Sequence, residues 1–141
     1  MPSGRFEPGF TNAYVGVPFL SHGRDREGWD CWGLLRVFYE EQFGIRLPSY
    51  DESYQDALTD ESNIQRVFQR EREQWVPIEA PEIGDAIWMR IVGHEMHVGV
   101  WCGPDRMLHT IDGIGSHIQR LDSPSWRKRI LSFYRHRLRP R

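Results

Sequence analysis

Residues 28–39 read GWDCWGLLRVFY, which puts a cysteine directly after an aspartate, where an apolar pattern of helical period begins. Its apolar residues recur at i, i+3, i+4 and i+7, one face of an α-helix, in the order Cys31, Leu34, Leu35 and Phe38. Gly44 suits the C-terminal cap of this helix. Asp30 stands at the N-cap position, where its carboxylate can accept a hydrogen bond from the amide of Trp32 or Gly33. Cys31 is therefore predicted to be the first helical residue.

Downstream of this helix, residues 59–74 predict a second, one-sided surface helix. From Ile83 onward the period changes to two, which predicts successive strands joined by hairpins. The predicted strands are 85–92, 96–102, 106–111, 117–121 and 130–136. Helices followed by a run of strands indicate an α+β fold, with N-terminal helices packed on an antiparallel sheet of about five strands.

The length and charge of the chain bear on its domain organisation. A chain of 141 residues with 39% hydrophobic content can bury one core, so we expect one domain over residues 1–141, with an N-terminal arm at 1–14. Residues 127–141 contain seven Lys and Arg and no acid, which leaves a net charge of −9 on residues 1–126. This basic C-terminal strand or tail could contact nucleic acid, anionic lipid or an acidic protein. We expect instead a solvated face or a subunit contact, with no nucleic-acid partner.

The sequence also bears on thiol state and targeting. Cys102 falls in an alternating run with Val98 and Val100, which indicates a buried strand face, so we expect Cys31 and Cys102 to be free thiols. Residues 1–10 have charges, Pro and Gly where a signal peptide needs an apolar core, and no segment approaches about 18 consecutive apolar residues. We therefore expect synthesis in the cytoplasm, no export signal and no membrane span.

The position of Cys31 raises the question of whether its thiol is a nucleophile. A helix N-terminus contributes about 0.3–1 kcal/mol, which lowers a thiol pKa near 8.5 by roughly one unit, and the charge of Asp30 opposes this effect. A reactive thiolate therefore needs an imidazole nearby. Of the six histidines, His97 is the best candidate, because it shares a strand face with Gly99, where the missing side chain could admit a helix end.

A third residue follows from the expected hairpin. If the strands pair about a turn centred on Gly103, His97 and His109 are directly opposed, and one imidazole can orient the other. The pattern thus supplies a nucleophile, a base and a base-orienting residue, the logic of a catalytic triad. The alternatives are a packed thiol at Cys31 and a structural histidine at His97. A metal site of His94, His97 and Cys102 is disfavoured, because alternation puts Cys102 on the opposite face from His97.

The motifs DCWGLL, GDAIWM and HVGVW, with a second histidine twelve residues after the first, resemble those of the NlpC/P60 family of papain-like cysteine peptidases. The resemblance implies hydrolysis of an amide bond in cell-wall peptidoglycan stem peptides, typically between D-γ-glutamate and a diamino acid. It implies Cys31 as nucleophile, His97 as base and His109 as the orienting residue. It implies no metal and no other cofactor.

Within this family, residues 17–50 look most like the small peptidases of phage tail tips and gene-transfer agents. That resemblance implies tail-tip or hub proteins as partners, assembly into a virion, and action at the cell wall or periplasm of a target cell. Two positions depart from the family: Phe19 stands where many members have Tyr, and Trp32 where many have Ser. The candidate substrate-contacting residues are Asp30, Trp32 and His22, although His22 also fits an ordinary surface residue and Asp30 a simple cap.

Two alternative functions remain open on the sequence. The chain could be a structural tail-tip subunit that keeps the peptidase fold with little or no catalytic role, as the basic C-terminus and N-terminal arm suggest. It could also transfer the acyl group of a thioester to an acceptor other than water, because the same nucleophile and base serve both reactions.

Overall fold

The computed structural model describes residues 6–50, 69–91 and 94–139, and it has the α+β architecture predicted from the sequence. The first part of the chain forms a 3-10 helix, a two-stranded ribbon and the long helix, namely η1 (Phe10–Ala13), β1 (Arg24–Asp25), β2 (Gly28–Trp29) and α1 (Cys31–Phe43). The remainder forms η2 (Arg72–Gln74), β3 (Trp75–Ile78), β4 (Ala86–Ile91), β5 (His94–Trp101), β6 (Arg106–Ile111), β7 (Gly115–Arg120), α3 (Pro124–Arg127) and β8 (Ile130–His136).

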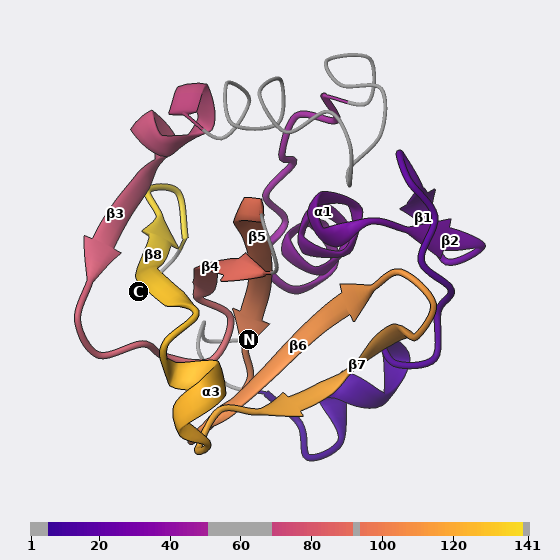
Figure 1. Ribbon diagram of the computed structural model, residues 1–141. Helices are drawn as coiled ribbons and strands as arrows, with labels where there is room; N and C mark the ends of the chain where they lie inside the picture. The colour runs from indigo at the N-terminus through magenta and orange to yellow at the C-terminus, as the bar shows by residue number, and fades with distance from the viewer. Residues whose placement is uncertain (1–5, 51–68, 92–93, 140–141) are drawn as a thin grey trace.

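The main sheet has six described strands in the order β3-β8-β4-β5-β6-β7, and all of its paired neighbours are antiparallel (Figure 1). The five predicted strands correspond to β4 to β8. The sixth, β3, lies at the edge of the sheet. The sequence pattern missed it because Pro77 lies inside it, and proline is tolerated in a strand chiefly at an edge.

The long helix begins and ends where the sequence predicts. The Asp30 carboxylate accepts a hydrogen bond of 2.9 Å from the Gly33 amide, and Gly44 closes the other end with a left-handed φ of 67°. Leu34, Leu35 and Phe38 are almost completely buried, as the periodicity predicts. The helix packs against β5 and β6, beside which Figure 1 shows it.

The sheet buries apolar side chains on both faces. Val98 and Val100 of β5 belong to the larger core that includes the helix residues Leu34 and Leu35. A second, smaller core is formed by Ile87, Met89, Met107 and Leu121, and Trp101 and Trp126 pack against it. Alternation along β5 therefore divides its side chains between two cores.

The register of the β5–β6 hairpin differs from the expectation. Val100 pairs with Leu108 and Trp101 with Met107, which centres the turn on Pro104 rather than Gly103. The reason is the turn itself, which contains Gly103, Pro104 and a left-handed Asp105, so that the backbone of Cys102 bonds that of Arg106. The prediction that His97 and His109 are directly opposed is therefore wrong.

Other expectations meet the structure only in part. Of the second predicted helix, residues 59–68 lie outside the described residues, while 69–71 are helical and lead into η2. The described part of the predicted N-terminal arm packs onto the domain, because Phe6 and Phe10 contact Phe38 and residues 10–13 form η1. Both thiols, Cys31 and Cys102, are free, as expected.

The basic C-terminal segment is part of the sheet rather than a separate tail. Strand β8 lies between β3 and β4. The side chain of Arg135 donates to the buried Asp85 carboxylate at 2.7 and 2.9 Å, and Arg139 also bonds this carboxylate. The expectation of a solvated face is therefore wrong for Arg135 and Arg139, which neutralise a buried acid.

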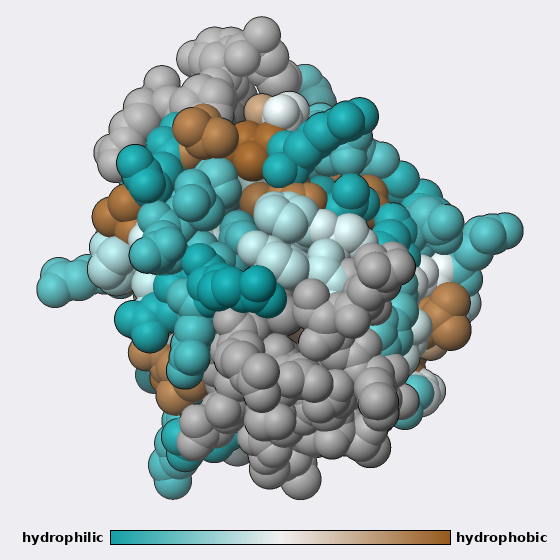
Figure 2. All heavy atoms as spheres, turned by 90° about the horizontal axis from the view of Figure 1, so that it is seen from above, coloured by the Kyte–Doolittle hydropathy of each residue, from teal (hydrophilic) through white to brown (hydrophobic). Residues whose placement is uncertain are grey.

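The exterior of the described residues is mainly polar. Seen from above, hydrophilic residues dominate and hydrophobic ones show in small separate groups (Figure 2). The large exposed apolar side chains, at positions such as Leu20, Ile114 and Leu138, come from well-separated parts of the chain. Among the described residues, no helix has the length and apolar character needed to cross a bilayer.

Candidate active site

The loop before α1 is tied to the helix start by Asp30. Its buried carboxylate accepts hydrogen bonds from the amides of Gly33 and His22, at 2.9 and 3.0 Å, and from the Arg24 guanidinium at 2.9 Å. Arg24 also donates to the backbone carbonyl of Ser49. These contacts fix the backbone on both sides of Cys31, which is the first residue of α1, as predicted.

The Cys31 thiol lies against strand β5. It interacts with the backbone of Val98, the residue after His97, and with the backbone of Trp32. The nucleophile candidate is therefore held beside the strand that carries the candidate base. The backbone of Val98 can interact with the thiol because it is not paired with β6. Among the described residues, β5 and β6 pair only at Val100↔Leu108 and Trp101↔Met107.

The electrostatic environment of Cys31 differs from the expectation of an activated thiolate. Burial raises the pKa of the Cys31 thiol to about 12, and the Asp30 charge adds to the rise. The backbone groups of Val98 and Trp32 and the Arg24 charge lower this pKa, but by less. The protein therefore favours the thiol over the thiolate at neutral pH, so a nucleophilic role for Cys31 would require a base to accept the proton.

The two candidate imidazoles are in contact despite the shifted register. The Nε2 atom of His97 lies 3.0 Å from Nδ1 of His109, and the rings meet edge-on. They meet diagonally, because the register extrapolated from Val100↔Leu108 puts Gly99 opposite His109. The sequence suggested that Gly99 leaves space for a helix end. In the structure its missing side chain leaves space for Met107 instead, because an added Cβ would lie 2.5 Å from Sδ of Met107.

The third predicted residue, His109, is a completely buried imidazole. Burial lowers its pKa to about 2, and the charges of His97 and His117 act in the same direction. The indole of Trp126, from α3, meets the His109 ring edge-on at 5.4 Å between centroids. His109 is therefore a neutral hydrogen-bonding group at physiological pH and does not itself act as an acid or base.

A further histidine, His117, extends this arrangement and was missed as a site residue. Its Nε2 lies 3.2 Å from Nε2 of His109, and its Nδ1 lies 2.9 Å from the carbonyl oxygen of Gly115. The residues His109 and His117 are direct cross-strand partners on β6 and β7. Pairing these two strands about the Asp112-Gly113 turn would have revealed this neighbour from the sequence.

The structure does not support a substrate contact for two of the three proposed residues. The Trp32 side chain is 2% exposed, and its indole N–H donates to the Pro48 carbonyl, so it is a core residue. The Asp30 carboxylate is 1% exposed and makes the internal bonds described above, so it is a cap and loop anchor. Only His22 is partly exposed, in a left-handed conformation with φ of 66°.

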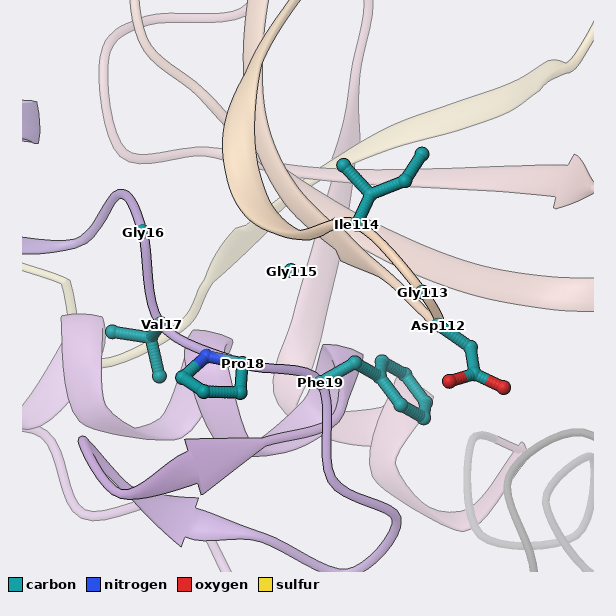
Figure 3. Close-up of a pocket in the computed structure, with 8 residues that line it drawn as sticks. All are labelled: Gly16, Val17, Pro18, Phe19, Asp112, Gly113, Ile114 and Gly115. Carbon is teal, nitrogen blue, oxygen red and sulfur yellow. The ribbon is translucent and has the colours of Figure 1, made fainter.

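A hollow of about 450 Å³ adjoins these elements. It is lined by residues 16–19 on one side and by the β6–β7 turn, residues 112–115, on the other (Figure 3). The side chains of Phe19 and Asp112 lie next to each other at one end of it, and Phe19 forms a β-bridge with Trp29, two residues before Cys31. Gly115, on its wall, also supplies the carbonyl bonded by His117. The hollow therefore adjoins segments that hold both the candidate nucleophile and the histidines.

The histidines do not converge on a metal position. Their nitrogens face one another in a row, and among the described residues no group of three or more His, Cys, Asp or Glu could hold a metal ion. A row of paired imidazoles is suited to orienting hydrogen bonds rather than to coordination.

Comparison with known proteins identifies the family of the chain. The model of the NlpC/P60 family matches residues 16–135, which include the helix start and the three strands that carry His97, His109 and His117. The chain belongs to the NlpC/P60 family. Three solved structures share the fold: a *Staphylococcus aureus* NLP/P60 lipoprotein-like protein (TM-score 0.61, 24% identity), the domain of the peptidoglycan hydrolase SagA (0.59, 19%) and a *Bacillus cereus* family member (0.65, 18%). The match covers 88%, 88% and 96% of this chain and 38%, 90% and 40% of theirs.

Curated NlpC/P60 relatives are similar in sequence over most of the chain. The *Escherichia coli* K12 protein named Murein DD-endopeptidase MepS/Murein LD-carboxypeptidase is 26% identical over 118 residues, covering 82% of this chain and 54% of the relative. A *Haemophilus influenzae* protein named Probable endopeptidase NlpC homolog is 25% identical, covering 82% and 53%. The chain thus spans about half the length of the curated relatives it matches.

Proposed function

We propose that this NlpC/P60 domain is a cysteine endopeptidase that hydrolyses amide bonds in peptidoglycan stem peptides. One observation carries the proposal: the Cys31 thiol lies at a helix start against the backbone of β5, the strand that bears His97, and His97 contacts His109 at 3.0 Å. The names of two similar proteins support the choice of substrate: MepS is named a murein endopeptidase and SagA a peptidoglycan hydrolase.

The chemistry requires general-base activation, because the thiol is the favoured resting form. As Sγ of Cys31 attacks the carbonyl carbon, His97 takes the thiol proton and then gives it to the leaving amine. The backbone amide at the start of α1 is the candidate donor to the oxyanion. Water, deprotonated by His97, then cleaves the thioester and releases the carboxylate and the Cys31 thiol.

We further propose that the bond cleaved joins D-γ-glutamate to a diamino acid, as the resemblance of the motifs suggests. The hollow beside Phe19 and Asp112 is the candidate position for the peptide on one side of that bond. Its 450 Å³ is in the usual range for ligand pockets.

The test is digestion of purified peptidoglycan by the wild type, Cys31→Ala and Cys102→Ala. We expect Cys31→Ala to release no product above background, while Cys102→Ala, the matched variant of the other free thiol, keeps activity within about threefold. Equal product release by the wild type and Cys31→Ala would exclude Cys31 as nucleophile. Mass spectrometry of the products separates hydrolysis, which leaves a free carboxylate, from transfer to another acceptor.

We also propose that the domain acts from a phage-like tail tip, on the resemblance of residues 17–50 to tail-tip and gene-transfer-agent peptidases. Purified particles from the producing strain should then contain this chain, and particles with Cys31→Ala should assemble but penetrate the wall poorly. Particles that lack the chain would contradict this location. Normal infection by Cys31→Ala particles, with failed assembly when the chain is deleted, would favour a structural subunit.

A further inference from the structure

Three imidazoles from three adjacent strands form a row, His97 on β5, His109 on β6 and His117 on β7. The row ends at the backbone carbonyl of Gly115. We propose that His117 is a positioning residue that fixes the tautomer of His109 and, through it, the tautomer of the proposed base His97. The inference rests on the proposed function for its catalytic consequence, although the tautomers themselves can be measured without it.

The hydrogen bond between His117 and the Gly115 carbonyl determines which nitrogen donates and which accepts along the row. A carbonyl oxygen only accepts hydrogen bonds, so Nδ1 of His117, 2.9 Å from the Gly115 oxygen, must carry the hydrogen. A neutral imidazole has one N–H, so Nε2 of His117 has the lone pair and accepts from Nε2–H of His109. The Nδ1 atom of His109 is then the acceptor, and Nε2 of His97 is the donor. The lone pair of His97 therefore lies on Nδ1, the ring nitrogen that does not contact His109.

This tautomer is the one that general-base chemistry needs. A neutral histidine can accept the Cys31 proton only at the nitrogen that has a lone pair, which the row assigns to Nδ1. With the opposite polarity, Nδ1 of His97 would carry a hydrogen and could accept nothing. His117 therefore acts on the reaction through two hydrogen bonds, without needing to touch the substrate.

The surroundings of the three imidazoles favour this assignment of donors and acceptors. His109 is completely buried under Trp126, and burial lowers its pKa to about 2, so it does not become the doubly protonated cation that would donate at both ends. The carbonyl anchor is equally constrained. Gly115 has φ of 87°, a Cβ there would lie 2.6 Å from the Val17 oxygen, and the Ser116 amide donates to that oxygen at 2.9 Å.

Two variants separate a positioning role from a merely space-filling one. His117→Phe keeps a planar ring but has no acceptor for Nε2–H of His109. His117→Gln keeps an amide that can accept from His109 and donate to the Gly115 carbonyl. A structural role predicts that Phe is tolerated at least as well as Gln, whereas a positioning role predicts the reverse order.

The first measurement is the tautomeric state of each histidine by ¹⁵N-edited NMR of labelled protein at about pH 7.5, where imidazoles are normally neutral. We expect hydrogens on Nδ1 of His117 and on Nε2 of His109 and His97, with His109 becoming a tautomer mixture in His117→Phe. A hydrogen on Nδ1 of neutral His97, a doubly protonated His117, or an unchanged His109 in His117→Phe would overturn the inference.

The second measurement is the steady-state kinetics of peptidoglycan hydrolysis. We expect kcat of His117→Phe to fall about tenfold or more with KM within about twofold, and His117→Gln to recover kcat to within about threefold of the wild type. Equal kcat values for the Phe and Gln variants would contradict the positioning role. A wild type without hydrolytic activity would refute the proposed function instead, and the NMR result would still decide the tautomers.

Discussion

At the scale of single residues, Cys31 combines a favourable position with an unfavourable electrostatic environment. The helix start and the backbone of Val98 and Trp32 favour the thiolate, but desolvation and the Asp30 charge outweigh them. Under the proposed mechanism, the nucleophile is therefore a thiol at rest, and its activation depends on the tautomer of His97. The neutral, buried His109 suits this arrangement, because it can direct a hydrogen bond without adding a charge.

This balance predicts the pH dependence of alkylation at Cys31. Since burial raises the thiol pKa to about 12, the iodoacetamide rate should still be rising above about pH 10, where an ordinary cysteine has levelled off. Peptide mass spectrometry distinguishes Cys31 from Cys102, whose pKa burial raises to about 11. In Asp30→Asn the cap acceptor remains and the charge is lost, so the Cys31 profile should shift to lower pH. A wild-type midpoint below about pH 8 would instead show a preformed thiolate–imidazolium pair.

At the scale of elements, the start of α1 depends on Asp30 more than a usual cap does. Its carboxylate serves the helix amide of Gly33, the loop amide of His22 and the guanidinium of Arg24. Because the Arg24 side chain is only 13% exposed, loss of the carboxylate leaves a poorly hydrated charge as well as an uncapped helix. The helix start, and with it the position of Cys31, is therefore held by one side chain.

Asp30→Ala should lower the free energy of unfolding by about 2–4 kcal/mol, from the lost cap and the unpaired arginine together. Urea denaturation followed by circular dichroism measures this change. The matched control is Asp25→Ala, which lies next to Arg24 in β1 but is exposed, and for which we expect a loss of less than about 1 kcal/mol. If the two variants unfold at the same urea concentration, Asp30 has no special role in the helix start.

The sequence was informative where one local rule decides the outcome. Helix α1 has its cap, its apolar stripe and its terminal Gly44 in consecutive sequence, so both ends were predictable. Turn residues such as Gly103-Pro104-Asp105 and Asp112-Gly113 separate strands within β4 to β8, so the strands could be located. The hairpin register was not predictable, because it depends on Asp105 adopting a left-handed conformation after Pro104. His97 and His109 nevertheless meet, because a diagonal cross-strand pair is still within reach of two imidazoles.

At the scale of the whole molecule, the C-terminal strand is inserted between two strands that precede it in the chain. Strand β8 pairs with β3 on one side and β4 on the other, although β3 and β4 precede it by many residues. No pattern in the sequence specifies such an insertion, which depends on long-range pairing. The basic residues that suggested a tail have a partner that sequence alone could not assign: Asp85 of the GDAIWM motif, which is completely buried.

The ion pairs of Asp85 with Arg135 and Arg139 should therefore contribute strongly to the free energy of unfolding, because they connect the C-terminal segment to the rest of the fold. Asp85→Asn leaves Arg135 and Arg139, whose side chains are 11% and 2% exposed, without their buried counter-charge. We expect the free energy of unfolding to fall by about 3–5 kcal/mol in urea denaturation. The control is Asp122→Asn, which removes an exposed, solvent-screened ion pair with Arg120 and should leave the free energy of unfolding nearly unchanged. Because both variants remove one carboxylate charge, a similar loss in each would mean that net charge matters and the burial of the pair does not. A loss confined to Asp85→Asn would show that the last strand is held in the sheet by its charges as well as by its backbone.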